Sequence, residues 1–181
     1  MTSASYITSL RILLIMPIAY LISNNSESSS FIAFSLLLIA GTTDYLDGYV
    51  ARKTNTVTEL GALLDLVADK LLICLLFVWL LTVYQSIYFV IPVMIILFRE
   101  ITISYIRQFL AENKNESKLR VRRLGKSKTI VQFIAISMFM LVPVMGQSFH
   151  RLAFIVLWTA SILSLLSLVD YFFSWKNRTN S

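Results

Sequence analysis

The sequence contains one cysteine, Cys74, and one histidine, His150, and this scarcity excludes several kinds of site. A single thiol rules out a disulfide framework within the chain and the paired-cysteine spacing of zinc sites. With no second histidine or cysteine beside it, His150 is expected to be a loop or interface residue. Cys74 lies in an apolar run and is expected to be a small buried hydrophobic side chain.

Charged side chains are also few. They make up 14% of the 181 residues, against about 25% in an average soluble domain. Hydrophobic residues make up 57%, and the mean hydropathy is +0.74. There is no internal repeat and no low-complexity domain. The composition therefore predicts a membrane protein with a single domain that covers residues 1–181.

Six stretches are apolar and long enough to cross a bilayer as helices, which takes about 20 residues each. We predict spans over residues 6–22, 31–51, 57–84, 88–111, 127–145 and 152–175. The expected fold is an all-α integral membrane protein with six transmembrane helices.

Basic residues are distributed unevenly among the connections. The segment 112–128 holds seven of them, two follow the second span and two lie in the C-terminal tail, whereas the three alternate loops hold only Arg151. Because cytoplasmic loops carry the excess of Lys and Arg, both termini are expected to face the cytoplasm. The basic segment also suits anionic lipid headgroups. Nucleic acid is not an expected partner, since the basic patch is small and no soluble module carries it.

Four aspartates gather between the second and third apolar segments, where charge is costly. Asp44 and Asp47 are three residues apart and Asp65 and Asp69 are four apart, so each pair shares one helix face. A short connection makes the two helices antiparallel neighbours, which lets the four carboxylates converge. Carboxylates in a membrane must be neutralised, paired or solvated. Oxygen ligands favour a hard ion, Mg²⁺, Mn²⁺ or Ca²⁺, over zinc.

An alternative is that these aspartates pair with the neighbouring basic residues Arg52, Lys53 and Lys70 at a helix end. Such pairs would account for one or two carboxylates but not for four on two matched faces. We therefore favour a metal site.

Small residues flank the same region, at Gly48, Ala51 and Gly61. They allow close helix packing, and they equally allow a phosphorylated ligand to approach the backbone. Arg52 suits a bidentate phosphate contact, and it suits an interfacial position at a helix end equally well.

The acidic region reads Asp44-x2-Asp47-Gly48-x2-Ala51-Arg52-x8-Gly61-x3-Asp65-x3-Asp69. This pattern resembles the complete signature of the CDP-alcohol phosphotransferases, with all eight defining positions filled at the family's spacing. The prediction of six helices agrees with that family's architecture along nearly the whole chain.

The resemblance implies an integral membrane enzyme, a homodimer, that needs Mg²⁺ or Mn²⁺. Such an enzyme moves a substituted phosphate from a CDP-linked donor to an alcohol and releases CMP. Asp44, Asp47 and Asp65 would hold two metal ions, with Asp69 close enough to contribute. Asp69 would also be the general base that takes the proton of the attacking hydroxyl. The cytidine and diphosphate pocket would be lined by Asp44, Gly48, Ala51, Arg52 and Gly61.

Three further stretches resemble the phosphatidylglycerophosphate synthase branch of the family. They are TSLR at Thr8–Arg11, FREITISYIRQFL at Phe98–Leu110 and LGKSKTIVQ at Leu124–Gln132. Two positions depart from the usual pattern, with Ser5 in place of an asparagine and Leu66 in place of a proline. The branch works at the cytoplasmic membrane of bacteria. It transfers a phosphatidyl group from CDP-diacylglycerol to sn-glycerol 3-phosphate in phospholipid biosynthesis.

An acceptor that carries a phosphate dianion needs a cationic pocket. Arg99 and Arg107 lie near one face of the fourth span, and Lys126 and Lys128 open the fifth, where a helix N-terminus also attracts anions. We predict that these four residues bind the acceptor phosphate. Glu100 is expected to pair with Arg107 or with another of these cations. The excess of basic residues on the cytoplasmic side explains the position of Lys128 easily. It explains Arg99 poorly, since Arg99 lies inside the helix.

Other functions stay open at this point. Within the family, the acceptor could be inositol phosphate, serine or phosphatidylglycerol, the last as in a cardiolipin synthase. A neutral acceptor would not need a cluster of deep cations, which favours a phosphorylated one. A cation transporter should show broken helices and a repeat, and a membrane prenyltransferase should show two separate Asp-rich motifs. The sequence shows neither pattern. Release of CMP would separate these classes.

Overall fold

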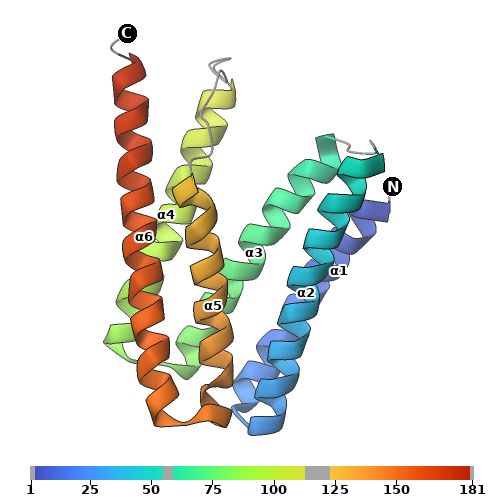
Figure 1. Ribbon diagram of the computed structural model, residues 1–181, viewed down its shortest axis with the longest axis vertical. Coiled ribbons are helices and arrows are strands. Elements are labelled where there is room, and N and C mark those ends of the chain that lie inside the picture. The colour runs from blue at the N-terminus through green and yellow to red at the C-terminus, as the bar shows by residue number, and fades with distance from the viewer. Residues whose placement is uncertain (1–2, 55–58, 113–122, 180–181) are drawn as a thin grey trace. The chain divides into compact units, whose positions relative to one another are not determined.

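The computed structural model describes residues 3–54, 59–112 and 123–179, and their side chains over 11–43, 67–106 and 128–172. The described residues form six helices and no strand, which confirms the all-α prediction (Figure 1). The helices are α1 (Ser3–Asn24), α2 (Glu27–Thr54), α3 (Glu59–Val83), α4 (Ile87–Glu112), α5 (Arg123–Met145) and α6 (Gln147–Thr179).

Three helices contain stretches long and apolar enough to cross a membrane. These are Ile87–Ile106 in α4, Lys128–Met145 in α5 and Gln147–Phe172 in α6. The described parts of α1 and α2 hold shorter apolar stretches. Helix α3 ends one residue before its predicted span does, and residues 57–58 of that span lie outside the described residues. Three spans are therefore supported by length and composition, and the count of six stays a prediction.

The chain divides into two compact units, which we describe separately. The first contains Met1–Tyr84 and Ile136–His150, and the second contains Gln85–Ala135 and Arg151–Ser181. The prediction of a single catalytic domain over residues 1–181 is not tested by this division and stays a prediction.

In the first unit, α1 packs against both α2 and α3. The turn between α1 and α2 is stabilised by its own residues. Asn25 adopts a positive φ of 46°, a conformation that Asn tolerates better than most residues. The Ser26 hydroxyl then accepts a hydrogen bond from the Ser29 amide (3.3 Å) at the start of α2, which is the arrangement of a helix N-cap.

Near the C-terminal ends of α1 and α3, polar side chains of the first unit form hydrogen bonds. The Trp79 indole donates to the Ser23 hydroxyl (2.7 Å), and the Tyr84 hydroxyl donates to the Phe139 carbonyl (2.8 Å). The Tyr84 and Phe139 rings also meet edge to face. Cys74 of α3 is only half-buried, so the expectation of a buried thiol was wrong.

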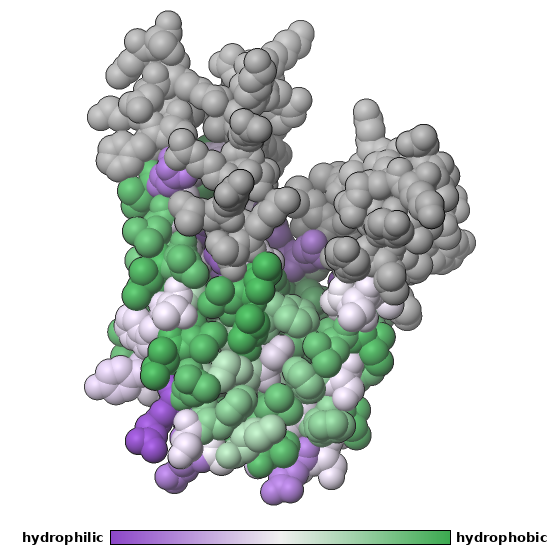
Figure 2. Space-filling model, in the orientation of Figure 1, coloured by the Kyte–Doolittle hydropathy of each residue, from purple (hydrophilic) through white to green (hydrophobic). Residues whose placement is uncertain are grey.

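In the second unit, α4 and α6 contact each other through the Phe89 and Phe154 rings, which meet edge to face. Phe89 and Val93 of α4 and Leu157 of α6 are fully buried. Large hydrophobic side chains such as Ile101, Tyr105 and Ile155 point outward instead. Hydrophobic residues cover most of the coloured surface in Figure 2. An outer surface of this kind fits a protein whose helices contact lipid.

Candidate active site

The four aspartates lie on two successive helices at matched distances from their connection. Asp47 lies seven residues before the end of α2, and Asp65 lies six residues after the start of α3. Asp44 and Asp69 each lie ten residues from the same two ends. At 1.5 Å per residue, these depths are about 10 Å for the first pair and about 15 Å for the second.

Chain length keeps the two helix ends close. Five residue steps separate Thr54 from Glu59, and they can span at most about 18 Å. The backbone positions of the two aspartate pairs therefore lie at similar distances from this connection. Carboxylate oxygens are ligands that a hard divalent cation prefers.

Most side chains of the acidic signature fall outside the described part of the chain. This applies to the predicted metal ligands Asp44, Asp47 and Asp65. It applies equally to the predicted nucleotide-binding residues Gly48, Ala51, Arg52 and Gly61. Among the described side chains, no group of three His, Cys, Asp or Glu residues comes together. The metal ligands and the nucleotide pocket therefore stay predictions.

Asp69 is the one aspartate of the signature whose side chain the structure describes, and it pairs with Arg11 of α1. The Arg11 Nη1 atom donates to Oδ1 of Asp69 at 2.7 Å. The Arg11 side chain is only 2% exposed, whereas the Asp69 side chain is 47% exposed. This ion pair joins the acidic signature to a helix that the signature does not include.

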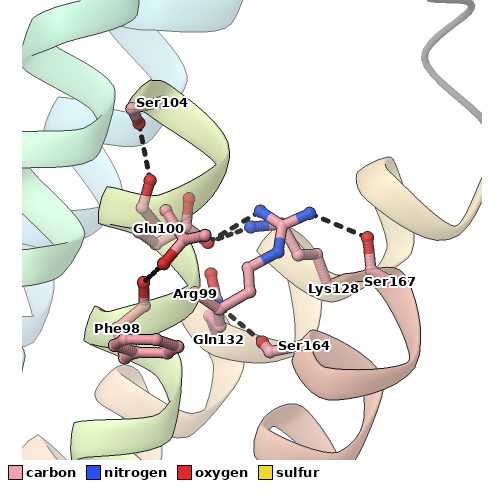
Figure 3. A network of polar contacts seen from close by, with 9 residues as sticks. Phe98, Arg99, Glu100, Ser104, Lys128, Gln132, Ser164 and Ser167 are labelled. Atoms are coloured by element: carbon pink, nitrogen blue, oxygen red, sulfur yellow. Dashed lines mark hydrogen bonds and ion pairs between the residues drawn. The ribbon is translucent and has the colours of Figure 1, made fainter. Parts of the chain in front are cut away.

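A second polar site lies in the other unit, where α4, α5 and α6 meet (Figure 3). We call Arg99, Glu100, Lys128 and Ser167 the buried cation cluster. Arg99 Nη1 lies 3.3 Å from Oε1 of Glu100, Lys128 Nζ bonds the same oxygen, and Arg99 Nη2 donates to Ser167 Oγ at 2.7 Å. The two cations and one carboxylate leave a formal charge of +1 in a region where Arg99, Glu100 and Lys128 are 5%, 9% and 4% exposed.

The buried cation cluster brings together two of the four residues predicted to bind the acceptor phosphate. Arg99 and Lys128 both point toward Glu100 (Figure 3). The expected partner of Glu100 was Arg107 or another of these cations, and the structure shows Arg99 and Lys128 in that place. Side chains of Arg107 and Lys126 lie outside the described residues, so the acceptor pocket as a whole stays a prediction.

Sequence reasoning missed the residues that support these two sites. Arg11 was noted only for a resemblance in its N-terminal stretch. Ser167 was not considered, nor was the Gln132–Ser164 hydrogen bond (3.0 Å) that lies beside the cluster. One feature of the sequence could have identified them. Polar side chains inside apolar helices are rare and usually have a partner.

Comparisons with known proteins agree with the acidic signature. A sequence model of the CDP-alcohol phosphatidyltransferase family matches residues 1–166. Three bacterial relatives carry the name CDP-diacylglycerol–glycerol-3-phosphate 3-phosphatidyltransferase. The protein of Haemophilus influenzae is 39% identical over 145 residues, which are 80% of this chain and 77% of the relative. The protein of Rickettsia bellii is 35% identical over 178 residues (95% and 94%), and that of Escherichia coli K12 is 34% identical over 143 residues (79% and 78%). This chain therefore belongs to the CDP-alcohol phosphatidyltransferase family, and the resemblance seen in its sequence is confirmed.

Proposed function

We propose that this protein transfers the phosphatidyl group of CDP-diacylglycerol to sn-glycerol 3-phosphate, giving phosphatidylglycerophosphate and CMP. The observation that carries the proposal is the complete eight-residue signature, whose aspartates lie at matched depths on α2 and α3. Relatives that share 34–39% of the aligned residues bear the name of this activity.

Members of the family generally use divalent metal ions. We assign Asp44, Asp47 and Asp65, with a contribution from Asp69, as the residues that would hold two Mg²⁺ or Mn²⁺ ions. When bound, such ions neutralise the diphosphate oxygens and stabilise the leaving phosphate. Gly48, Ala51 and Gly61 would let the nucleotide approach the helix backbones, and Arg52 would contact the diphosphate.

We assign Asp69 as the general base. Its carboxylate would accept the proton of the acceptor hydroxyl as the oxygen attacks the phosphorus that bears the diacylglycerol. A new O–P bond forms to the acceptor, and the P–O bond to the cytidylate breaks. CMP leaves with the bridging oxygen and its negative charge. Positioning and electrostatic stabilisation supply most of the rate in reactions of this kind.

The buried cation cluster supports a phosphorylated acceptor. Arg99 and Lys128 are buried cations that outnumber the Glu100 carboxylate. Charge-assisted hydrogen bonds from such cations suit a phosphate dianion. Arg107 and Lys126 are proposed to complete the pocket, together with Arg99 and Lys128. If the acceptor were neutral, these buried cations would not be needed to bind it.

We further propose six spans, a homodimer and cytoplasmic termini in a bacterial-type inner membrane. The protein is an integral membrane protein with apolar helices, and its named relatives are bacterial. Basic residues concentrate between α4 and α5 and after α2, which favours a cytoplasmic position for the ends that carry the acidic signature. There a lipid donor can keep its acyl chains in the bilayer while its headgroup meets a soluble acceptor.

The test is CMP release by the purified protein in detergent with CDP-diacylglycerol and Mg²⁺. The acceptor panel contains glycerol 3-phosphate, inositol, inositol phosphate, serine and phosphatidylglycerol. Release with glycerol 3-phosphate alone is expected. Release with phosphatidylglycerol alone would instead indicate a cardiolipin synthase, and no release with any acceptor would overturn the proposal.

Asp69→Asn tests the assignment of the general base. We expect this variant to bind Mn²⁺ and CDP but to lose most of its turnover. Glu27→Gln, an exposed charge change at the start of α2, is the control and should keep wild-type turnover. Unchanged turnover in Asp69→Asn would remove Asp69 as the base.

A further inference from the structure

Arg11 lies outside the acidic signature, yet it has the largest side chain among the fully buried residues that the structure describes. It is part of α1, a helix whose neighbouring residues are mostly apolar. A buried cation is expensive in a membrane protein unless it meets an anionic partner. An anionic partner is present in the Asp69 carboxylate, whose Oδ1 lies 2.7 Å from Arg11 Nη1.

The packing of α1 on α3 fixes the position of this pair. On α1, Arg11 continues the buried stripe formed by Ile15, Ile18, Ala19 and Ile22, at the spacings of one helix face. On α3, Asp69 continues the buried stripe of Leu72, Ile73, Leu76 and Leu80. The ion pair therefore ends an apolar contact between the two helices. Packing already restrains both helix backbones. Formation of the ion pair therefore costs little further conformational entropy.

The Asp69 carboxylate needs such a restraint if it is to receive a proton in a defined direction. Its side chain is 47% exposed, and the terminal torsion of an aspartate is broad rather than confined to narrow wells. A hydrogen bond to Oδ1 fixes the rotation of the carboxylate group and with it the direction of the second oxygen.

We propose that Arg11 is a positioning residue, which holds Oδ1 of Asp69 so that the other carboxylate oxygen faces the attacking hydroxyl. This inference rests on the proposed function and deepens it. Arg11 acts through Asp69 and contacts neither the donor nor the acceptor. A misplacement of about 1 Å can lower turnover about a hundredfold, so a residue of this kind has a large effect on kcat without binding substrate.

The test compares Arg11→Met, Arg11→Lys, Asp69→Asn and the double variant Arg11→Met/Asp69→Asn. Arg151→Met, at an exposed arginine of α6, is the matched control. For each protein we would measure kcat, both KM values, thermal unfolding and Mn²⁺ affinity by electron paramagnetic resonance.

We expect Arg11→Met to lower kcat by about 30- to 100-fold while both KM values and the Mn²⁺ affinity change less than about threefold. Arg11→Lys should recover part of the loss, because lysine keeps the charge but not the planar fork. The double variant should be no slower than Asp69→Asn alone, since residues that act as a unit are not additive. Arg151→Met should behave as the wild type does.

Three results would overturn the inference while leaving the proposed function intact. A multiplicative loss in the double variant would show that Arg11 acts independently of Asp69. A raised KM for CDP-diacylglycerol as the main effect would make Arg11 a donor ligand. Loss of Mn²⁺ binding or of cooperative unfolding in both Arg11 variants would make its role structural. A wild-type protein that releases no CMP would instead overturn the proposed function, and the inference with it.

Discussion

Removal of the Glu100 carboxylate is expected to destabilise the protein strongly, because it leaves two buried cations facing each other. Arg99 Nη1 and Lys128 Nζ bond the same Glu100 oxygen, so these two nitrogens are at most about 6 Å apart, two hydrogen-bond lengths. At an effective dielectric constant of about 20, two unit charges at that separation repel by about 3 kcal/mol. This figure agrees with the loss of about 3–5 kcal/mol seen when one partner of a buried ion pair is removed.

The perturbation is Glu100→Gln, which keeps the size of the side chain and removes its charge. A loss of about 3 kcal/mol in a chain of this length lowers Tm by about 6–12 °C. Thermal unfolding in detergent, followed by circular dichroism, measures the shift. Glu27→Gln removes an exposed carboxylate of α2 and should change the free energy of unfolding by less than about 0.5 kcal/mol.

A second variant separates charge repulsion from a packing defect. Glu100→Gln/Lys128→Met removes one of the two cations and keeps an apolar stem of similar length. We expect it to recover about half of the lost stability or more, because replacing buried ion pairs by apolar side chains is often neutral. A Tm for Glu100→Gln equal to that of Glu27→Gln would refute the electrostatic reasoning. A double variant less stable than Glu100→Gln would refute it as well.

Three further predictions follow from the sites described above. EDTA should abolish CMP release, and Mg²⁺ or Mn²⁺ should restore it. Arg107→Ala should raise KM for glycerol 3-phosphate about tenfold or more, as expected for a lost charge-assisted hydrogen bond. It should raise KM for CDP-diacylglycerol less than about twofold. Equal effects on both KM values would indicate a structural role for Arg107. Tyr84→Phe should cost about 1 kcal/mol, because the Tyr84 hydroxyl donates to the Phe139 carbonyl. Thermal unfolding in detergent would measure this loss, and an unchanged Tm in Tyr84→Phe would contradict it.

The parts of the fold that local geometry dictates were predictable from the sequence. Apolar stretches of sufficient length predicted helices, and the structure has six of them among its described residues. Spacings of three and four residues predicted that Asp44 and Asp47 share one helix face and that Asp65 and Asp69 share another. All four positions lie in helices, α2 and α3, and the convergence of their carboxylates stays a prediction. The family followed from the same spacing.

The contacts that depend on helix packing were not predictable. Arg11 and Asp69 are 58 residues apart in the sequence, and only the packing of α1 on α3 brings them together. Arg99 and Ser167 are 68 apart. For Glu100, the sequence predicted Arg107 or another of the four cations as the partner, and the structure shows Arg99 beside it and Lys128, 28 residues away on α5. Spacing along one helix is readable from sequence, but the rotation of one helix against another is not.

The most direct test of the central claim follows an isotope from the acceptor into the lipid. Purified protein in detergent would be given CDP-diacylglycerol, Mg²⁺ and glycerol 3-phosphate whose primary hydroxyl carries oxygen-18, and the products would be analysed by mass spectrometry. Because the acceptor oxygen attacks the phosphorus of the phosphatidyl group, we expect phosphatidylglycerophosphate that retains the label and an equal amount of unlabelled CMP. CMP without the labelled lipid, or no CMP at all, would contradict the account.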